Sequence, residues 1–207
     1  ALFDFSPADA QNLMMGFAEA MRRGLTQASG SLKMIPSYVG RPTGKEQGTY
    51  LALDLGVTNL RVLAVRLDGQ GGAATDAASR FVVPQDRMRG EGTVLFDFLA
   101  DCLSLFFKNH RLDRLSPWEL GFTFSFPVAQ TAVNAGALLT WTKGFTASGV
   151  EGQNVAALLA NALARKNLSA ISVAALCNDT VGTLSAKSYA DPSCDMGVIL
   201  GTGTNAC

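Results

Sequence analysis

Three segments of the chain share one design, in which an apolar strand-like run leads into a turn of small and polar residues. They are LALDLGVTNLR (51–61), VAALCNDTVGTL (173–184) and MGVILGTGTNAC (196–207). In open α/β sheets, ligands bind beyond the carboxyl ends of the strands. We therefore expect the three turns to converge on one crevice or to lie at its facing edges.

The first turn combines a carboxylate with residue types that bind phosphate. Asp54 is flanked by strand residues and is expected to be half-buried. Because an unpaired buried carboxylate is costly, it requires a cation or hydrogen-bond donors nearby. Gly56 allows a close approach of the backbone, and Thr58, Asn59 and backbone N–H groups are good phosphate donors. The alternative is an ordinary hairpin turn, in which the Asp and Asn side chains bond to the backbone.

The second turn offers a candidate general base. Asp179 lies between a strand end and a helix start, beside Asn178. A carboxylate can take the proton of a hydroxyl during phosphoryl transfer, where catalysis is mostly positioning and charge stabilisation. The single histidine, His110, lies in the polar segment KNHR, so a carboxylate is the better candidate. The alternative role for Asp179 is that of a helix N-cap.

The third turn, GTGTNA (201–206), has the form GxGxxA after a strand, which is a weak dinucleotide-binding fingerprint. It would point to an NAD-dependent oxidoreductase. The helix and the ribose-binding acid expected about 20 residues further on are not in the sequence, so the fingerprint lacks its context. The hydroxyls of Thr202 and Thr204 also suit a phosphate chain.

Thr142 and Lys143 place a hydroxyl beside an ammonium in LTWTKGF (139–145). Such a pair suits a sugar or a phosphate, whereas a solvated lysine is the ordinary alternative. The segment GRPTGKE (40–46) does not fit a phosphate loop. Its first glycine is one residue too close, and Glu46 stands where a Ser or Thr hydroxyl must meet magnesium. No GxSxG, HExxH or Cys–His arrangement occurs, which disfavours serine hydrolases, zinc proteases and thiol proteases.

Composition is typical of a globular chain of one large domain, or of one domain and a piece of another. Of the 207 residues, 48% are apolar and 16% charged, and the 17 basic residues equal the 17 acidic ones. No basic field is available for a nucleic acid, and no apolar run reaches membrane-spanning length. The four cysteines have no CxxC spacing, which disfavours a zinc site, and we expect a reducing, cytoplasmic environment.

Hydrophobic periodicity predicts the elements that position these turns. We expect helices at 7–23, 93–109, 154–166 and 180–189, and strands at 49–55, 60–67, 80–83, 119–124, 171–176 and 196–200. Residues 68–79 read as a polar loop, and Leu13, Phe17 and Met21 as a helix stripe packed on a neighbour. The order predicts an α/β fold whose sheet is mixed at its start and parallel afterwards.

Six stretches, taken together and in order, resemble the hexokinase family. They are LALDLGVTNLRVL, FTFSFP, LLTWTKGF, GVEGQNVAALLANALAR, NDTVGT and GTGTNAC, and the resemblance runs from Met34 to the end of the sequence. It implies a sugar kinase on the actin-like ATPase fold, in which two ribonuclease-H-like lobes, each a mixed sheet flanked by helices, close over a cleft.

The same resemblance implies a division of the chain and a set of ligands. Residues 1–33 would form an N-terminal helix that packs on the large lobe in this family, residues 34–190 the small lobe, and residues 191–207 the start of a large lobe that is mostly absent. The ligands would be a hexose such as glucose, ATP and magnesium (Mg2+), with no nucleic-acid or membrane partner. The oligomeric state stays open.

Roles follow from the resemblance at matching positions. Asp179 is expected to take the proton of the sugar 6-hydroxyl, with Lys143 near the transferred phosphoryl group. The expected sugar contacts are Ser125, Thr142, Lys143, Asn178, Asp179 and Asn205. The expected phosphate-binding residues are Asp54, Gly56, Thr58, Asn59 and Arg61 in one loop, and Gly201, Thr202 and Gly203 in another. Asp54 would also hold the metal ion through water.

Two departures from the family pattern affect the expected activity. Val57 stands where the family usually has a second glycine, and a β-branched side chain adds bulk beside the phosphates, so the property that it would affect is nucleotide affinity rather than the fold. The family also continues beyond position 207 with two sugar-binding glutamates and the adenine pocket, so we expect the chain alone to be nearly inactive. A non-catalytic sugar-binding or regulatory protein on the same scaffold is the alternative function.

Overall fold

A computed structural model of the chain describes residues 4–26, 30–56, 58–201 and 204–207. The chain divides into two compact units, Ala1–Pro36 and Ser37–Cys207. The first unit carries helix α1, Pro7–Thr26. Its start is stabilised by reciprocal bonds, because the Asp9 N–H donates to Ser6 Oγ and the Ser6 N–H donates to the Asp9 carboxylate.

The apolar stripe of α1 is not buried by the other described residues of its own unit. No residue of α1 is buried, and Leu13 and Phe17 are more than half exposed. The helix was predicted correctly, and the packing of its stripe on a neighbour stays a prediction. Helix formation needs only local capping and propensity, whereas burial of the stripe needs a partner surface.

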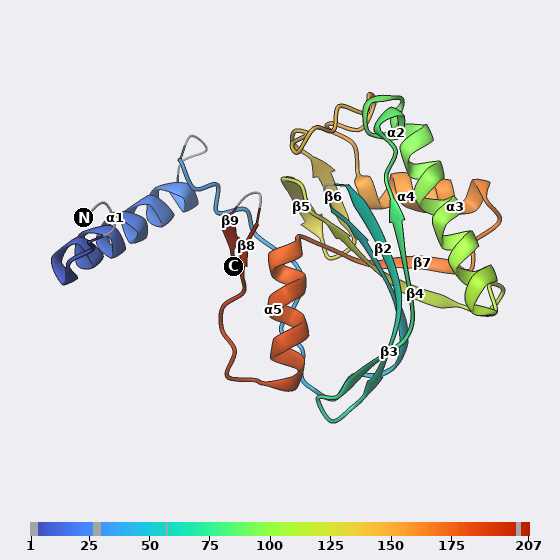
Figure 1. Cartoon of the computed structure of the whole chain (residues 1–207), viewed down its shortest axis with the longest axis horizontal. Helices are drawn as coiled ribbons and strands as arrows, with labels where there is room; N and C mark the ends of the chain where they lie inside the picture. The colour runs from blue at the N-terminus through green and yellow to red at the C-terminus, as the bar shows by residue number, and fades with distance from the viewer. Residues whose placement is uncertain (1–3, 27–29, 57, 202–203) are drawn as a thin grey trace. The chain divides into compact units, whose positions relative to one another are not determined.

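The second unit is built on a five-stranded sheet with the order β3-β2-β1-β4-β7 (Figure 1). The strands are β1 (Gln47–Leu55), β2 (Asn59–Asp68), β3 (Ala73–Val82), β4 (Trp118–Phe124) and β7 (Ile171–Cys177). Strand β2 pairs antiparallel with both β1 and β3, whereas β1, β4 and β7 run parallel to one another. This arrangement confirms the predicted mixed sheet and brings the carboxyl ends of β1, β4 and β7 to one edge.

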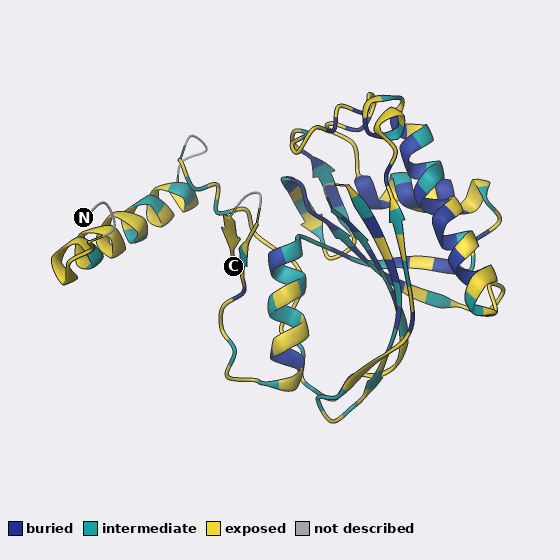
Figure 2. Cartoon of the chain, viewed as in Figure 1, coloured by how far each residue is buried: buried dark blue, intermediate teal, exposed yellow. Residues whose placement is uncertain are grey.

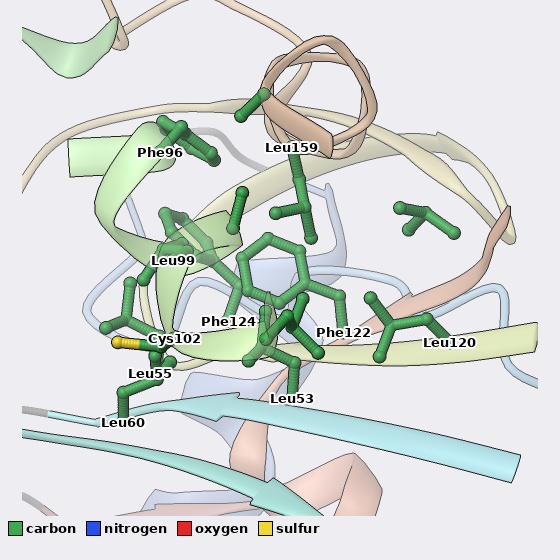
Figure 3. Packing of buried hydrophobic residues seen from close by; sticks show 14 of the residues in the cluster. Leu53, Leu55, Leu60, Phe96, Leu99, Cys102, Leu120, Phe122, Phe124 and Leu159 are labelled. Carbon is green, nitrogen blue, oxygen red and sulfur yellow. The ribbon is translucent and has the colours of Figure 1, made fainter. Parts of the chain in front are cut away.

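One face of the sheet is covered by α3 (Gly92–His110) and α4 (Val155–Arg165), and it holds the hydrophobic core. Figure 3 shows Leu53 and Phe122 of the sheet packed between Leu99 of α3 and Leu159 of α4. All four side chains are fully buried, and Figure 2 shows that buried residues concentrate in this layer. The predicted Asn154 cap of α4 is confirmed, because its side chain accepts bonds from two backbone N–H groups.

The other face of the sheet is polar at its carboxyl edge and is approached by α5 (Asp179–Ala190). Because successive side chains of a strand alternate between faces, Asp54, Thr123 and Cys177 lie opposite the core. A Cβ atom at Gly182 of α5 would lie 3.7 Å from both Cys177 Sγ and Thr123 Oγ1. Helices therefore flank both faces of the sheet. Within the described residues, no helix has the length and apolar character of a membrane span.

The predicted polar loop at 68–79 was wrong over most of its length. Strand β3 occupies Ala73–Val82 and pairs with β2 along the edge of the sheet. Only Ala77 of this strand is buried, so an edge strand with two largely solvated faces carries no alternating apolar signal. The true turn is shorter, and the Asp68 side chain closes it by accepting from the Gln70 and Gly72 N–H groups.

Several short elements were also not predicted. They are α2 (Gln85–Arg89), the hairpin β5 (Val128–Ala132) and β6 (Ala135–Leu138), and the hairpin partner β9 (Thr204–Ala206) of β8 (Val198–Leu200). Each has five residues or fewer, too few to show a hydrophobic period. The predicted strand at 196–200 is therefore present as β8, but it pairs only with β9 and does not extend the five-stranded sheet.

Candidate active site

The first predicted phosphate loop lies at the tight turn between β1 and β2. The Gly56 N–H donates to the Asn59 carbonyl at 3.0 Å, and Asn59 Nδ2 donates to Thr58 Oγ1 at 2.9 Å. A Cβ atom at Gly56 would lie 3.5 Å from the Asn59 carbonyl oxygen, which is an ordinary contact, so packing within the fold does not by itself require glycine here. Val57 lies outside the described residues.

Asp54 precedes this turn and faces the polar side of the sheet. It is half-buried, and Arg61 lies directly opposite it on β2, with Nη1 4.0 Å from the carboxylate. Burial raises the pKa of the Asp54 carboxyl, and the Arg61 charge opposes this rise. The negative charge of Asp179 raises the Asp54 pKa further, and the Lys143 ammonium lowers it. Charged groups predicted from three separate motifs thus act on one carboxylate.

Arg80 of β3 is a residue that sequence reasoning missed. The strand register places it directly opposite Arg61, in the same cross-sheet row as Asp54. Its Nε donates to Asn59 Oδ1 at 2.9 Å, and it forms no ion pair within the described residues. Two arginines side by side repel each other, which favours an anion at this end of the row. The signal was hidden, because only the register of β3 reveals the neighbour of Arg80.

The β7–α5 junction positions Asp179 as the first residue of α5. Asn178 is the N-cap, and its Oδ1 accepts from the Thr180 N–H at 3.2 Å. The alternative that Asp179 itself is the cap is therefore wrong. Asp179 is half-buried, and its Oδ1 also accepts from the Thr180 N–H, at 2.9 Å.

Lys143 is held, rather than freely solvated. Its Nζ donates to the Ser125 carbonyl at 2.8 Å and lies 5.7 Å from the ring centre of Phe126. The backbone of Lys143 has a φ of 58°, in the left-handed region that costs free energy for a residue with a Cβ atom. The turn is closed by the Phe145 N–H, which donates to the Thr142 carbonyl at 3.1 Å. Strain of this kind clusters at functional sites.

An aromatic cluster supports this turn. Trp141 stacks on Phe145 with ring centres 5.3 Å apart, and Phe126 meets Trp141 edge-on at 4.8 Å. The Trp141 indole N–H donates to the Ala147 carbonyl, so the polar end of the ring is also satisfied. Thr142 is exposed beside the cluster, and Ser125 is buried next to it. The predicted pair Thr142-Lys143 therefore lies beside a packed aromatic cluster.

Asn205 of β9 contacts the β7–α5 junction. Its Nδ2 donates to Asn178 Oδ1 at 2.9 Å and to Thr180 Oγ1 at 3.2 Å. The contact brings together two predicted sugar residues that are far apart in sequence. It also adds Thr180, a buried residue that sequence reasoning did not assign to the site.

Two paired strands, rather than a strand and a helix, flank the start of the segment GTGTNA. Gly201 directly follows β8, and Thr204–Ala206 form β9, which pairs antiparallel with β8. A dinucleotide fingerprint requires a helix at this point, so the oxidoreductase interpretation is not supported. Thr202 and Gly203, the other members of the predicted second phosphate turn, lie outside the described residues.

Magnesium fits this site only together with a nucleotide. The described residues contain no group of three or more His, Cys, Asp and Glu side chains that could hold a metal ion. Proteins commonly hold Mg2+ through one or two carboxylates, with water and substrate phosphates as the other ligands. The half-buried Asp54 carboxylate is suited to that part.

Comparison with known proteins assigns the chain to a family. The family model described as "Hexokinase" matches residues 1–189. Hexokinase from Schistosoma mansoni is 44% identical over 207 residues, covering 98% of this chain and 46% of that protein. Hexokinase-3 from Mus musculus is 49% identical over 190 residues, covering 91% of this chain and 20% of that protein. The chain thus spans half or less of these relatives.

The fold agrees with a solved structure of the same kind. The structure of hexokinase from Schistosoma mansoni complexed with glucose matches 99% of this chain, and 46% of that chain, with a TM-score of 0.89 and 43% identity. The sheet flanked by helices is therefore the actin-like ATPase architecture expected from the motifs. The family match also begins at residue 1, earlier than the motif resemblance at Met34. The chain belongs to the hexokinase family.

Proposed function

We propose that this chain is part of an ATP-dependent hexokinase, which transfers the γ-phosphoryl group of ATP to the 6-hydroxyl of a hexose such as glucose. The observation that carries the proposal is the position of Asp179. It lies at the carboxyl edge of the sheet, beside the joined Asn178 and Asn205, and its negative charge raises the pKa of Asp54, which the Lys143 charge lowers. The glucose in the Schistosoma mansoni structure supports the choice of sugar.

In the proposed mechanism, Asp179 accepts the proton of the sugar 6-hydroxyl as its oxygen attacks the γ-phosphorus. The new oxygen–phosphorus bond forms while the bond to the β-phosphate oxygen breaks, and ADP leaves. Lys143 stabilises the negative charge of the transferred group, since its ammonium is held in place by the Ser125 carbonyl. Ser125, Thr142, Asn178 and Asn205 would hold the sugar.

The phosphates of ATP would lie over the β1–β2 turn. Asp54, Gly56, Thr58, Asn59 and Arg61 form the first proposed phosphate loop, and the second comprises Gly201, Thr202 and Gly203. When bound, Mg2+ would neutralise part of the phosphate charge, with Asp54 holding it through water.

The proposed organisation extends to the whole chain. Residues 1–33 would form an N-terminal helical element, 34–190 the small lobe and 191–207 the start of a large lobe. We propose a cytoplasmic location, consistent with four cysteines that form no disulfide in the structure.

The decisive experiment separates catalysis from sugar binding in the full-length protein. Glucose binding is measured by calorimetry, and turnover with Mg-ATP by a coupled ADP-release assay, for the wild type and Asp179→Ala. We expect turnover to fall about 10²–10⁴-fold, the usual contribution of a general base, while glucose still binds. Asp101→Ala, an exposed aspartate of α3 that pairs with Lys166, is the matched control and should keep wild-type turnover.

Two results would overturn the proposal. Near-wild-type turnover of Asp179→Ala would remove the base from its role. Glucose binding by the wild type without any phosphorylation would instead support a non-catalytic sugar-binding protein on the same scaffold.

A further inference from the structure

Thr180 carries one of the few buried polar side chains in the described part of the chain. It is 2% exposed and follows the proposed base directly. Its hydroxyl donates to Asn178 Oδ1 at 2.9 Å and accepts from Asn205 Nδ2 at 3.2 Å. The three side chains therefore form a closed triangle, because Asn205 Nδ2 also donates to Asn178 Oδ1, at 2.9 Å.

The triangle determines which end of the Asn178 amide faces inward. Asn178 Oδ1 accepts from the Thr180 N–H, the Thr180 hydroxyl and Asn205 Nδ2. A backbone N–H can only donate, so it excludes the opposite orientation, in which Asn178 Nδ2 would face it. The Asn178 oxygen is consumed, and its NH2 group is the end left for a ligand.

At Asn205 it is the oxygen end of the side-chain amide that stays free for a ligand. Its NH2 group has two hydrogens, and they match the two acceptors Asn178 Oδ1 and Thr180 Oγ1. The Asn205 Oδ1 atom is the end left for a ligand. One asparagine therefore offers a donor and the other an acceptor, which together match a hydroxyl group, because a hydroxyl both accepts and donates.

We propose that Thr180 is a positioning residue, which fixes Asn178 as a hydrogen-bond donor and Asn205 as an acceptor toward one hydroxyl of the sugar. This inference rests on the proposed hexokinase function. The Thr180 hydroxyl donates to one asparagine and accepts from the other through a single oxygen atom. Selectivity then has a physical basis, since a sugar that lacks this hydroxyl leaves two polar groups of the site unpaired.

The test compares Thr180→Val with Thr180→Ser in the full-length protein. Valine keeps the shape of threonine but removes both hydrogen bonds, whereas serine keeps the hydroxyl. For Thr180→Val we expect the KM for glucose to rise about 10–100-fold, the effect of one or two lost hydrogen bonds, with the KM for ATP within about twofold. Thr180→Ser should stay within about threefold of the wild type for both substrates.

A panel of glucose analogues tests the donor and acceptor assignment. In each analogue one hydroxyl other than the 6-hydroxyl is replaced by hydrogen or by fluorine. At one position, the wild type should bind the fluoro sugar almost as poorly as the deoxy sugar, because fluorine cannot donate to Asn205 Oδ1. In Thr180→Val, glucose should bind about as weakly as the deoxy and fluoro sugars of that position, and of that position alone. The reason is that glucose itself no longer meets oriented partners there.

A second variant keeps the inference testable if Thr180→Val does not fold. Asn205→Asp replaces the donating NH2 group by an oxygen that repels Asn178 Oδ1. Glucose should then lose its binding advantage over the deoxy and fluoro sugars at the same position of the panel. The inference is overturned if Thr180→Val binds glucose like Thr180→Ser. It is also overturned if every analogue and ATP weaken by the same factor. Absence of hexose phosphorylation by the wild type would instead contradict the proposed function.

Discussion

The Lys143 ammonium donates a hydrogen bond to the Ser125 carbonyl, with 2.8 Å between the two atoms. This bond joins the loop after β4 to a turn 18 residues later in the chain. It explains how a long, flexible side chain is held in one place while its own backbone adopts a left-handed conformation. Because of this relationship, a substitution of Lys143 can test its role in turnover separately from its effect on stability.

Lys143→Asn should abolish most activity without destabilising the protein. Asparagine tolerates left-handed backbone better than lysine, which offsets the lost bond to Ser125, so we expect the free energy of unfolding to change by less than about 1 kcal/mol. Turnover should fall about 100-fold or more, because a positioned charge is removed from the transferred group. Urea unfolding and the coupled assay measure the two effects. The exposed Lys108 provides the control Lys108→Asn, and equal turnover losses in both variants would contradict the prediction.

Arg80→Gln should weaken nucleotide binding selectively. Arg80 lies next to Arg61 and bonds to Asn59 of the proposed phosphate loop. We expect the KM for ATP to rise about tenfold, since charge-assisted bonds to phosphate contribute about 1.5–3 kcal/mol, while the KM for glucose is unchanged.

The control for Arg80 is Arg66→Gln. Arg66 lies on β2 and pairs with Asp76 on β3, so it is a cation on the same two strands with an acidic partner of its own. Steady-state kinetics at two salt concentrations measures both variants. An ATP KM that responds equally to both substitutions would show that Arg80 acts only through general charge.

Asp54→Asn should stabilise the protein at neutral pH. Burial raises the pKa of the Asp54 carboxyl above its ordinary value of 3.8, so the folded state retains this proton to a higher pH than the unfolded state. The free energy of unfolding of the wild type therefore falls as the pH rises above 3.8. Asp54→Asn removes the titrating carboxyl, so the variant does not show this fall. The gain over the wild type, measured by urea unfolding without ligands, should grow from pH 4 to pH 7.

Asp68→Asn provides a control of opposite sign. Backbone bonds from Gln70 and Gly72 lower the pKa of the Asp68 carboxyl. Its stabilising effect is therefore present above pH 3.8 and is lost as the pH falls through the lowered pKa. Asp68→Asn should cost stability at pH 7 and little at the lowest pH. The same pH trend in both variants would contradict these assignments.

Gly197→Ala should disturb the sugar site from outside it. A Cβ atom at Gly197 would lie 2.8 Å from the Thr180 carbonyl and 3.0 Å from Leu184 Cβ, so the segment directly before β8 must move away from α5. That movement separates Asn205 from Asn178, and we expect the KM for glucose to rise about tenfold, as for one lost hydrogen bond. Gly182→Ala is the matched control, because its Cβ atom would meet only ordinary contacts at 3.7 Å. Equal glucose KM values for the two variants would show that the two segments are not coupled.

Elements with strong local signals were predicted from the sequence. The β1–β2 hairpin follows from apolar runs on either side of a glycine turn, and α4 from its period and its Asn154 cap. Of strand β3 only the end was predicted, within the expected strand at 80–83, because an edge strand with one buried residue does not alternate over most of its length. The role of Arg80 was hidden with it, since a residue gains a cross-strand neighbour only when the register is known.

The residue types of the site were determined by the sequence alone, because a carboxylate, an ammonium and glycine-flanked hydroxyls have the same chemistry in any fold. Their family and sheet architecture also followed from ordered motifs. Only the tertiary structure decided which end of the Asn178 amide faces outward, which carbonyl holds Lys143 and which arginine stands beside Arg61. Hydrogen bonds and cross-strand contacts join residues far apart in the chain, and their directions depend on the distances that folding sets.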